Sequence, residues 1–385
     1  MNLLYLHCHD AGRYIQPHHP GLKTPRLQAL AEEGMLFRQA HCANPTCSPS
    51  RAGLMTGRCA HAVGMLGLAH RGWRLDDYTQ TLPAFLGRRG YHSALSGQQH
   101  IAAPPFAEVK AIGYNEIVTR DAGLEAAAAG AESFLARSHN KPFFLDVGFF
   151  APHRAGDSGD FPRDFPPEDE RYLTPPACLP DNPATRRDFA LYAASVRSAD
   201  QAMGRVLDAL ERSGQADNTL VIATTDHGIA FPKMKCRLSD HGTGVFLILR
   251  GPGGFEGGKT TDALVSQLDL FPTLCDLLGL DAPDSLEGRS LRHLADDPLA
   301  SHREALFAEV NYHAAAEPMR SVRTPRWKYI RNYAEDRHPR LPNIDNSISK
   351  YHLFREGLAE QTLPTEELYD LVEDPQENRN RADDP

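Results

Sequence analysis

The sequence of 385 residues predicts an α/β fold: a large, mixed but mainly parallel sheet between helices, followed by a small α+β subdomain. Over the first three quarters of the chain, short apolar runs alternate with capped helical segments, which is typical of a layered α/β fold. The runs are apolar throughout, as in strands that are buried on both faces. After about residue 295 the pattern changes to longer, antiparallel-type strands. We therefore expect a main domain over 1–295 and a C-terminal subdomain with an antiparallel sheet over 296–385.

The individual elements follow from local signals. Thr24, Pro25 and Gly34 have the order of an N-cap, a first helical residue and a stop, which predicts a helix between them. An amphipathic pattern predicts one long helix from Asn182 to Gly214. The Pro- and Asp-rich segment 154–181 is expected to be a surface loop. Strands of the main sheet are expected at 2–8, 91–97, 142–150 and 219–225, and strands of the subdomain at 303–313, 319–333 and 367–375.

Composition excludes several classes of protein. The net charge of −9 argues against a nucleic-acid partner, which requires a basic face. Seven cysteines, an odd number without a CxxC pair, indicate reduced thiols rather than a disulfide framework. No stretch is long enough to span a membrane, and the N-terminus lacks the pattern of a signal peptide. The default expectation is a cytoplasmic protein without a membrane partner, although a chain trimmed of its export signal would read the same.

Chemically active residues follow all four expected strands of the main sheet. In α/β sheets, ligand sites form at the carboxyl ends of the strands. Any one of these short motifs is common as a turn, a helix cap or a solvated loop. Their shared position at strand ends favours a functional site. The residues concerned are His9 and Asp10, then Gln98 and His100, then His153, and finally Asp226 and His227.

The stretch "CSPSR", from Cys47 to Arg51, indicates an anion pocket. Ser48 is suited to cap a helix and Pro49 to its first turn. Cys47 is then expected at the positive end of a helix dipole, where an anion is stabilised. Arg51, one turn further on, is expected to point back to the same place. The alternative is that Cys47 is simply a small buried side chain, which is common for cysteine.

The motifs together resemble the type I sulfatases of the alkaline-phosphatase superfamily. Their signature, C-x-P-S-R followed by an L-x-T-G-R-like run, reads "CSPSRAGLMTGR" here. The blocks "PFFLDVGFFAPHR", "TLVIATTDHGIAFP" and "ELYDLVEDPQENRN" also resemble the family, in the expected order. Within the family the likeness is greatest to the heparan N-sulfatases. The resemblance implies an alkaline-phosphatase-like fold, with 1–295 as the catalytic domain.

The resemblance also implies a formylglycine, made from Cys47, and one divalent metal ion. Asp10, Asp226, His227 and residue 47 are the expected metal ligands, and His9 is a fifth ligand or merely orients Asp10. His9 stands where the family usually has Asp, and His227 where it often has Asn. Calcium is expected by resemblance. The two imidazoles suit manganese or another transition metal better than calcium, which prefers oxygen ligands.

The same likeness assigns the remaining roles. Arg51 and Lys235 are expected to hold the sulfate oxygens, and His100 and His153 to contact the sulfate or protonate the leaving group. Gln98 departs from the family, because the G-K-x-H motif reads G-Q-Q-H here. An amide donates a hydrogen bond to sulfate but adds no charge. The segments "GLAHRGWRLDD" and "NYHAAAEP" either line the substrate mouth or are ordinary surface loops.

The expected function is hydrolysis of a sulfuric ester or sulfamate, on a sulfated sugar or a similar small sulfate. A formylglycine-generating maturation enzyme is the expected protein partner. One alternative is a phosphonate monoester or phosphodiester hydrolase of the same superfamily, whose sites share these features. The other is a non-catalytic metal- or glycan-binding relative, which Gln98 and His9 support and the complete C-x-P-S-R motif opposes. The sequence leaves the choice between N-sulfate and O-sulfate open.

Overall fold

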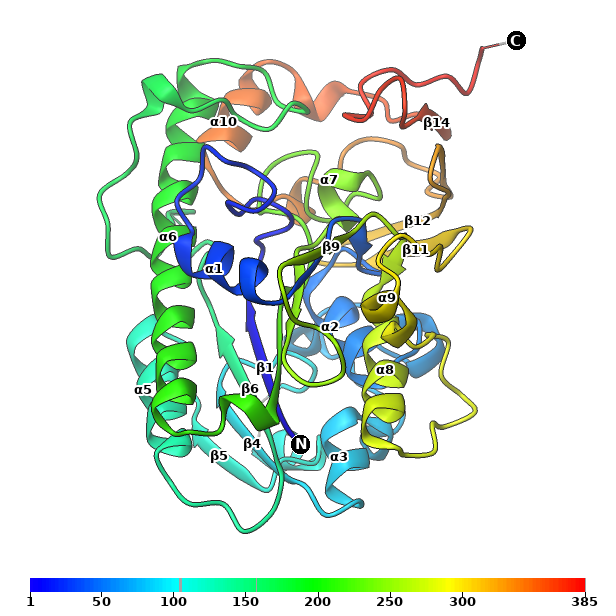
Figure 1. The fold of residues 1–385 in the computed structure, drawn as a ribbon. Coiled ribbons are helices and arrows are strands. Elements are labelled where there is room, and N and C mark those ends of the chain that lie inside the picture. Colours follow the sequence, from blue (N-terminus) through cyan, green and yellow to red (C-terminus); the bar gives the residue numbers. More distant parts are fainter. Residues whose placement is uncertain (104–105, 157, 385) are drawn as a thin grey trace.

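The main sheet of the protein contains eight strands and forms its centre (Figure 1). The computed structural model describes residues 1–103, 106–156 and 158–384. In spatial order the strands are β5 (Glu116–Thr119), β4 (His92–Gly97), β6 (Phe143–Phe149), β1 (Asn2–Cys8), β7 (Thr219–Thr225), β8 (Leu247–Arg250), β2 (Met35–Phe37) and β9 (Lys259–Thr261).

The direction and register of these strands confirm the predicted mixed, mainly parallel sheet. The run from β5 to β7 is parallel. Strand β8 is antiparallel to both of its neighbours, and β2 and β9 are again parallel to each other. In the parallel part, Cys8 at the end of β1 lies opposite Phe149 of β6 and Thr225 of β7. The residues that follow these strands therefore emerge at one level, on one edge of the sheet.

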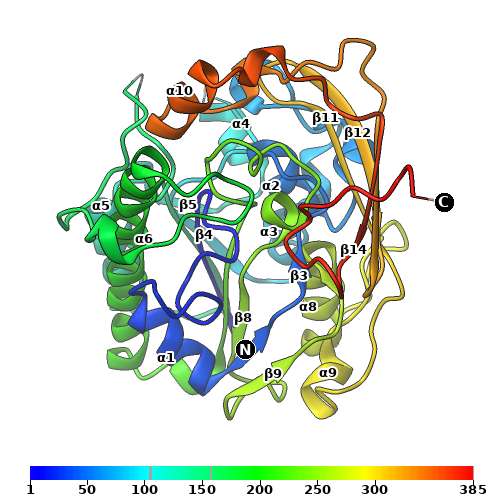
Figure 2. The ribbon, with the colours of Figure 1, turned by 90° about the horizontal axis from the view of Figure 1, so that it is seen from above.

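Helices cover both faces of the sheet (Figures 1 and 2). Leu4 and Leu6 of β1 belong to the apolar core under α1, α5 and α6, whereas Leu3 and Tyr5 belong to the core under α2, α3 and α8. Double-sided burial explains why this strand is a continuous apolar run. The helices are α1 (Pro25–Glu33), α2 (Cys47–Thr56), α3 (Leu82–Gly87), α4 (Phe106–Ala111), α5 (Leu124–Leu135), α6 (Pro183–Arg212), α7 (Asp240–Thr243), α8 (Leu270–Leu278), α9 (Arg292–Asp296) and α10 (Ile348–Arg355).

A separate antiparallel sheet forms the C-terminal part of the chain, beside the main sheet (Figure 2). Its strands alternate buried and exposed residues, as expected of a sheet with one solvated face. The sheet begins at Leu306, and the domain boundary at 295 stays a prediction. Its four strands are β11 (Leu306–Tyr312), β12 (Ala316–Arg323), β13 (Trp327–Asn332) and β14 (Glu366–Asp370), and a two-stranded sheet pairs β3 (Ala40–His41) with β10 (Val265–Ser266).

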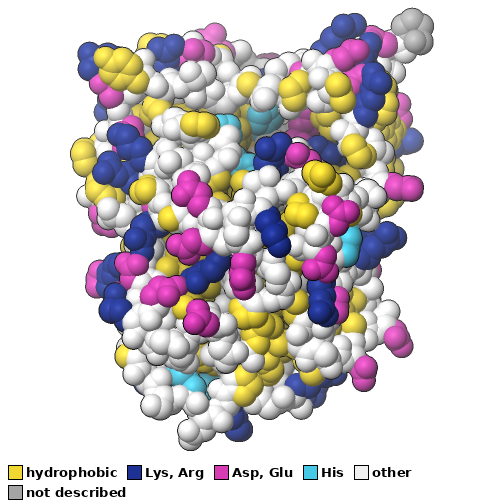
Figure 3. All heavy atoms as spheres, in the orientation of Figure 1, with side chains coloured by type: hydrophobic (Ala, Val, Ile, Leu, Met, Phe, Trp, Pro, Cys, Tyr) yellow, Lys and Arg dark blue, Asp and Glu magenta, His cyan; other side chains and the backbone are white. Residues whose placement is uncertain are grey.

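On the face seen in Figure 3, basic and acidic side chains are interspersed. Within the described ranges, no helix combines the length and the apolar character that a membrane span requires. The predicted surface loop 154–181 contains a single short 3-10 turn, Glu170–Tyr172, among its described residues.

A buried ion pair holds the loop that follows β6. The two terminal nitrogens of Arg154 donate to the two carboxylate oxygens of Asp188 in α6, each over 2.9 Å. Asp188 also accepts the backbone N–H of Ser349 in α10. Both charged side chains are almost fully buried. This loop also carries His153, so the ion pair anchors a candidate site residue to the helical layer.

We predict that Arg154→Met lowers the free energy of unfolding by about 3–5 kcal/mol, because it leaves the buried carboxylate of Asp188 without its charge partner. Urea unfolding followed by circular dichroism measures the change. Arg171→Met is the matched control, since Arg171 pairs with Asp169 in an exposed position and its loss should have little effect. If both variants lose the same free energy of unfolding, burial does not increase the contribution of the Arg154–Asp188 pair to stability.

Candidate active site

Cys47 is the first residue of α2, at the positive end of the helix, and its side chain is buried. The expectation that Ser48 caps this helix is wrong. The N-cap is Thr46, which makes no side-chain capping bond, and Ser48 lies within the first turn. Its hydroxyl instead accepts the backbone N–H of Ala69, over 2.9 Å. Ser48 thus joins the segment around Ala69 to the helix that carries Cys47.

The five residues expected around the metal converge in space. Nε2 of His227 lies 3.4 Å from Sγ of Cys47 and 3.4 Å from Oδ1 of Asp10. Nδ1 of His9 lies 3.2 Å from Oδ2 of Asp226. The other oxygen of Asp226 accepts the backbone N–H groups of Asp10 and His227. These bonds turn Oδ2 of Asp226 toward the centre of the cluster.

The atoms of this cluster fit a bound cation. Potential ligand atoms of His9, Asp10, Cys47 and Asp226 all lie within 4.8 Å of one another. Nε2 of His9 and Oδ1 of Asp10 are buried without a hydrogen-bond partner, which is costly unless another group binds them. Nδ1 of His227 lies 2.9 Å from the carbonyl oxygen of Gly228, which only accepts, so Nδ1 carries the proton. The lone pair of Nε2 then faces the cluster, as it does in a metal-binding histidine.

Arg51 lies behind the cluster and shapes its electrostatics. Its Nε and one terminal nitrogen lie 3.2 and 3.1 Å from Oδ2 of Asp226. Burial opposes ionisation, but the positive charge of Arg51 holds the pKa of Asp226 well below its usual value. Burial also raises the pKa of the Cys47 thiol well above its usual value. An unmodified Cys47 would therefore be a weak nucleophile at neutral pH.

Lys235 is the second buried positive charge at the site. Its Nζ lies 2.9 Å from Oδ2 of Asp10, 3.1 Å from Oδ2 of Asp345 and 3.4 Å from Nε2 of His153. Burial would lower the pKa of Lys235, but the two carboxylates raise it well above its usual value. The residue therefore stays charged, next to one of the candidate metal ligands.

The three remaining predicted residues differ in how closely they join the site. The ring centroid of His100 lies 5.8 Å from that of His9, and its Nε2 lies 3.1 Å from Nδ1 of His70. Burial and the charge of Arg51 lower the pKa of His100 to about 3. His153 reaches Lys235, whereas Gln98 stands apart. The backbone N–H of Gln98 extends the sheet to Gly148, and its side chain has no hydrogen bond among the described residues.

Asp345 is a site residue that the sequence analysis missed. It belongs to the C-terminal part, 110 positions after Lys235, and no motif marks it. His313, which belongs to the same part of the chain, is also buried, and burial lowers its pKa well below the usual value. His313 and His70 fall in the two segments considered as substrate mouth. The histidines were a usable signal, and the contact of His70 with His100 links the first segment to the predicted site residues.

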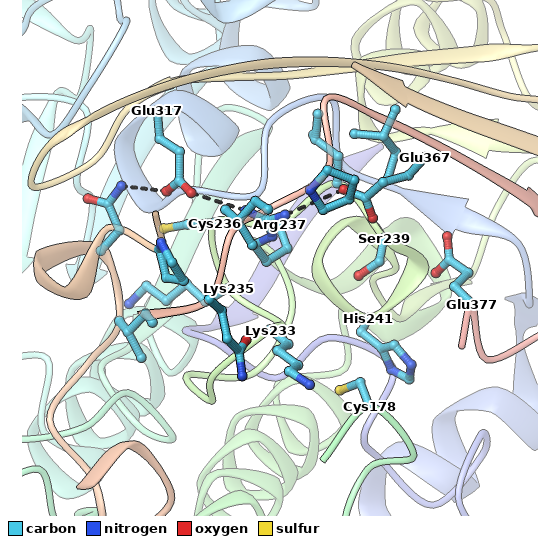
Figure 4. Close-up of a pocket in the computed structure, with 18 of the residues that line it drawn as sticks. Cys178, Lys233, Lys235, Cys236, Arg237, Ser239, His241, Glu317, Glu367 and Glu377 are labelled. Carbon is cyan, nitrogen blue, oxygen red and sulfur yellow. Dashed lines mark hydrogen bonds and ion pairs between the residues drawn. The ribbon is translucent and has the colours of Figure 1, made fainter. Parts of the chain in front are cut away.

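A pocket of about 260 Å³ adjoins Lys235, between segment 233–241 and the C-terminal sheet (Figure 4). Both parts of the chain contribute charged side chains to it. Arg237 forms an ion pair with Glu317 over 3.0 Å, and a second, longer one with Glu367. Cys47 does not line this pocket. The C-terminal sheet therefore helps to enclose the space beside the second basic residue of the site.

Comparison of the sequence with known families gives two matches. The family model described as Sulfatase matches residues 10–280. The model described as N-sulphoglucosamine sulphohydrolase, C-terminal, matches residues 235–352. The chain is 30% identical to the N-sulphoglucosamine sulphohydrolase of Homo sapiens, in an alignment that covers 98% of this chain and 84% of the relative.

Two solved structures illustrate the similarity of fold. One, in complex with its substrate D-glucosamine-2-N,6-O-disulfate, has a TM-score of 0.75 and 20% identity, and covers 99% of this chain and 93% of that one. The other, a phosphonate monoester hydrolase from Silicibacter pomeroyi, has a TM-score of 0.70 and 21% identity, and covers 100% and 91%. At these identities the structures establish the fold alone, which is the alkaline-phosphatase-like fold expected from the sequence.

Proposed function

The chain belongs to the sulfatase family, and on that premise we propose that it hydrolyses the sulfuric ester or sulfamate of a sulfated sugar, with a formylglycine made from Cys47 as the nucleophile. The observation that carries the proposal is the position of Cys47. It lies at the positive end of α2 and 3.4 Å from the lone-pair nitrogen of His227, beside two buried carboxylates. An unmodified thiol with a raised pKa would be a weak nucleophile at this position.

The two absent groups supply chemistry that the chain itself lacks. Formylglycine, in its hydrated form, would supply a nucleophilic hydroxyl and a second hydroxyl for the release of sulfate, and a divalent ion would supply Lewis acidity. Asp10, Asp226, His227 and residue 47 would hold the ion. The unpartnered Nε2 of His9 supports its role as a further ligand.

The side chains of this protein bind the sulfate and move the proton. Arg51 and Lys235 supply fixed positive charge for the sulfate oxygens, in a buried site where charge acts strongly. His100, whose pKa is lowered to about 3 by burial and Arg51, is neutral near pH 7 and serves as a hydrogen-bond donor. We assign protonation of the leaving oxygen or nitrogen to His153, whose side chain is 21% exposed and therefore accessible to a leaving group.

The first prediction is that Cys47 is formylglycine when the protein is made in a host with the maturation enzyme. Mass spectrometry of the tryptic peptide 39–51 tests it. The same peptide contains Cys42, which should remain a thiol that can be alkylated and thus serves as an internal control. An unmodified Cys47 thiol in active protein from such a host would contradict the proposal.

The second prediction concerns the two buried positive charges. Arg51→Ala and Lys235→Ala should each lower kcat/KM on the best sulfate substrate by about 10²–10³-fold, because each removes a charged donor from the transition state. Circular dichroism verifies that the variants are folded. Lys233→Ala is the control, since Lys233 is exposed, and it should keep near-normal activity. Near-normal rates for Arg51→Ala or Lys235→Ala would show that the assigned role is wrong.

The third prediction is that manganese supports activity at least as well as calcium, because His9 and His227 offer nitrogen ligands. The metal is removed with a chelator, and calcium, magnesium, manganese and zinc are restored separately. Activity and the shift of the melting temperature are both measured. His227→Asn, which provides an oxygen ligand, should shift the preference toward calcium. Restoration by calcium alone would show that the histidines do not set the preference, and full activity after stripping would exclude a catalytic metal.

The same assays separate this function from the alternative. A phosphonate monoesterase would turn over phenyl phosphonates with a higher kcat/KM than the matching sulfate esters. Higher turnover of sulfates and sulfamates supports the sulfatase assignment. The ratio between a glucosamine N-sulfate and an O-sulfate then decides which bond is the natural target.

A further inference from the structure

A chain of three buried polar side chains extends from Arg51 into the main sheet. A terminal nitrogen of Arg51, NH1, lies 2.8 Å from Nδ1 of His7. Nε2 of His7 lies 2.8 Å from Oδ1 of Asp146, and the hydroxyl of Tyr114 donates to Oδ2 of the same carboxylate over 2.5 Å. All four side chains are buried. None of the three residues behind Arg51 belongs to the cluster around Cys47.

Hydrogen-bond chemistry determines the state of the His7 ring. An arginine side chain only donates hydrogen bonds, so Nδ1 of His7 must accept the one from Arg51. The ring proton is therefore on Nε2, and it is donated to Asp146. The Tyr114 hydroxyl occupies the second oxygen of Asp146. Each member of the chain thus has a defined donor and acceptor, which leaves one orientation for the His7 ring.

The neighbouring strand is adapted to this ring. His7 of β1 lies opposite Gly148 of β6. A Cβ atom at Gly148 would lie 2.5 Å from Cε1 of His7 and 2.1 Å from the carbonyl oxygen of Gln98. Only glycine leaves room for the imidazole at this point. The ring also stacks on Tyr5, with centroids 4.5 Å apart, so packing and hydrogen bonds hold it in the same place.

The guanidinium of Arg51 is consequently held from two sides. Nε and NH2 bond to Asp226, NH2 also reaches the carbonyl oxygen of Cys8 over 3.4 Å, and NH1 bonds to His7. A guanidinium has five N–H groups in one plane. His7 fixes the rotation of this plane on the side away from Asp226, and NH1 has a second N–H left for a substrate oxygen.

We propose that His7, Asp146 and Tyr114 are positioning residues, which orient Arg51 for the developing charge on the sulfate oxygens. The proposal rests on the function proposed above, which assigns Arg51 to the sulfate. A contact that is fixed before the reaction needs no reorganisation during it, and this is the main source of electrostatic catalysis. The three residues touch neither substrate nor metal and act through Arg51.

The kinetic test compares His7→Leu with His7→Gln. Leucine removes both hydrogen bonds, whereas the amide of glutamine again offers one acceptor and one donor. We expect His7→Leu to lower kcat by about 10²-fold, the effect of a misplaced catalytic group, with KM changed less than about threefold. His7→Gln should recover most of the lost kcat. Tyr114→Phe, which removes only the last bond of the chain, should have a smaller effect in the same direction.

His302→Leu is the matched control. His302 is also buried and lies 3.1 Å from a buried aspartate, Asp269, but it has no contact with Arg51. The His302→Leu substitution should lower the melting temperature and leave kcat near the wild-type value. Should His7→Leu keep kcat within threefold of the wild type, or His302→Leu lose as much as His7→Leu, the positioning role is refuted.

A double-mutant cycle with Arg51→Lys measures whether the effect of His7 on kcat depends on Arg51. A purely structural role of His7 predicts no such dependence. A lysine side chain cannot bond to Asp226 and His7 in the way that the guanidinium does. The loss of kcat caused by His7→Leu should therefore be much smaller in the Arg51→Lys background. Equal losses of kcat in the two backgrounds would refute the proposal.

The tautomer of His7 provides a measurement that is independent of turnover. Nitrogen-15 NMR of histidine-labelled protein should show that Nε2 of His7 is protonated and that its Nδ1 is unprotonated. Comparison with His7→Gln assigns the signals. A proton on Nδ1 would overturn the proposed hydrogen-bond order. If wild-type protein contains formylglycine but has no activity on sulfates, the proposed function is wrong. The NMR result would still determine which nitrogen of His7 carries the proton.

Discussion

The carboxylate of Asp226 is the group on which the rest of the site depends. One of its oxygens accepts two backbone N–H groups, from Asp10 and His227. The other faces Arg51 and His9. Asp226 therefore connects the end of β7 to the end of β1 and to the second turn of α2. A neutral or shorter side chain at this position would leave Arg51 as an uncompensated buried charge, which is costly.

The parallel register makes this meeting possible. Because β1, β6 and β7 end at one level, residues more than two hundred positions apart arrive at the same edge. Strand β8 then returns antiparallel, and the segment between β7 and β8 carries Lys235. Lys235 is held by Asp10 from β1 and by Asp345 from the C-terminal part. The C-terminal part thus completes the site as well as covering it.

Buried charges at the site are arranged in opposed pairs. Asp226 faces Arg51, and Lys235 lies between Asp10 and Asp345. Oδ1 of Asp10 and Nε2 of His9 have no hydrogen-bond partner, so both are available to bind a cation. The two buried positive charges of the site, Arg51 and Lys235, contact Asp226 and Asp10, and together they suit an anion with several oxygens, such as sulfate.

The sequence by itself determined the layered fold, the four strands that lead to the site and the cysteine-centred motif, because each depends on residues that are neighbours in the chain. The residues predicted for the site lie near one another, apart from Gln98, whose side chain has no hydrogen bond among the described residues, and their roles stay predictions. Only the tertiary structure decided the start of α2 at Cys47, the hold of Asp345 on Lys235 and the support of Arg51 by His7, Asp146 and Tyr114. In His7 and Asp146 the sequence shows a polar residue inside an apolar run, and nothing local indicates that the two are partners. Their bond spans 139 positions, and its existence depends on strand order and on the space left by Gly148. Such contacts are set by the packing of distant segments, which no local pattern records.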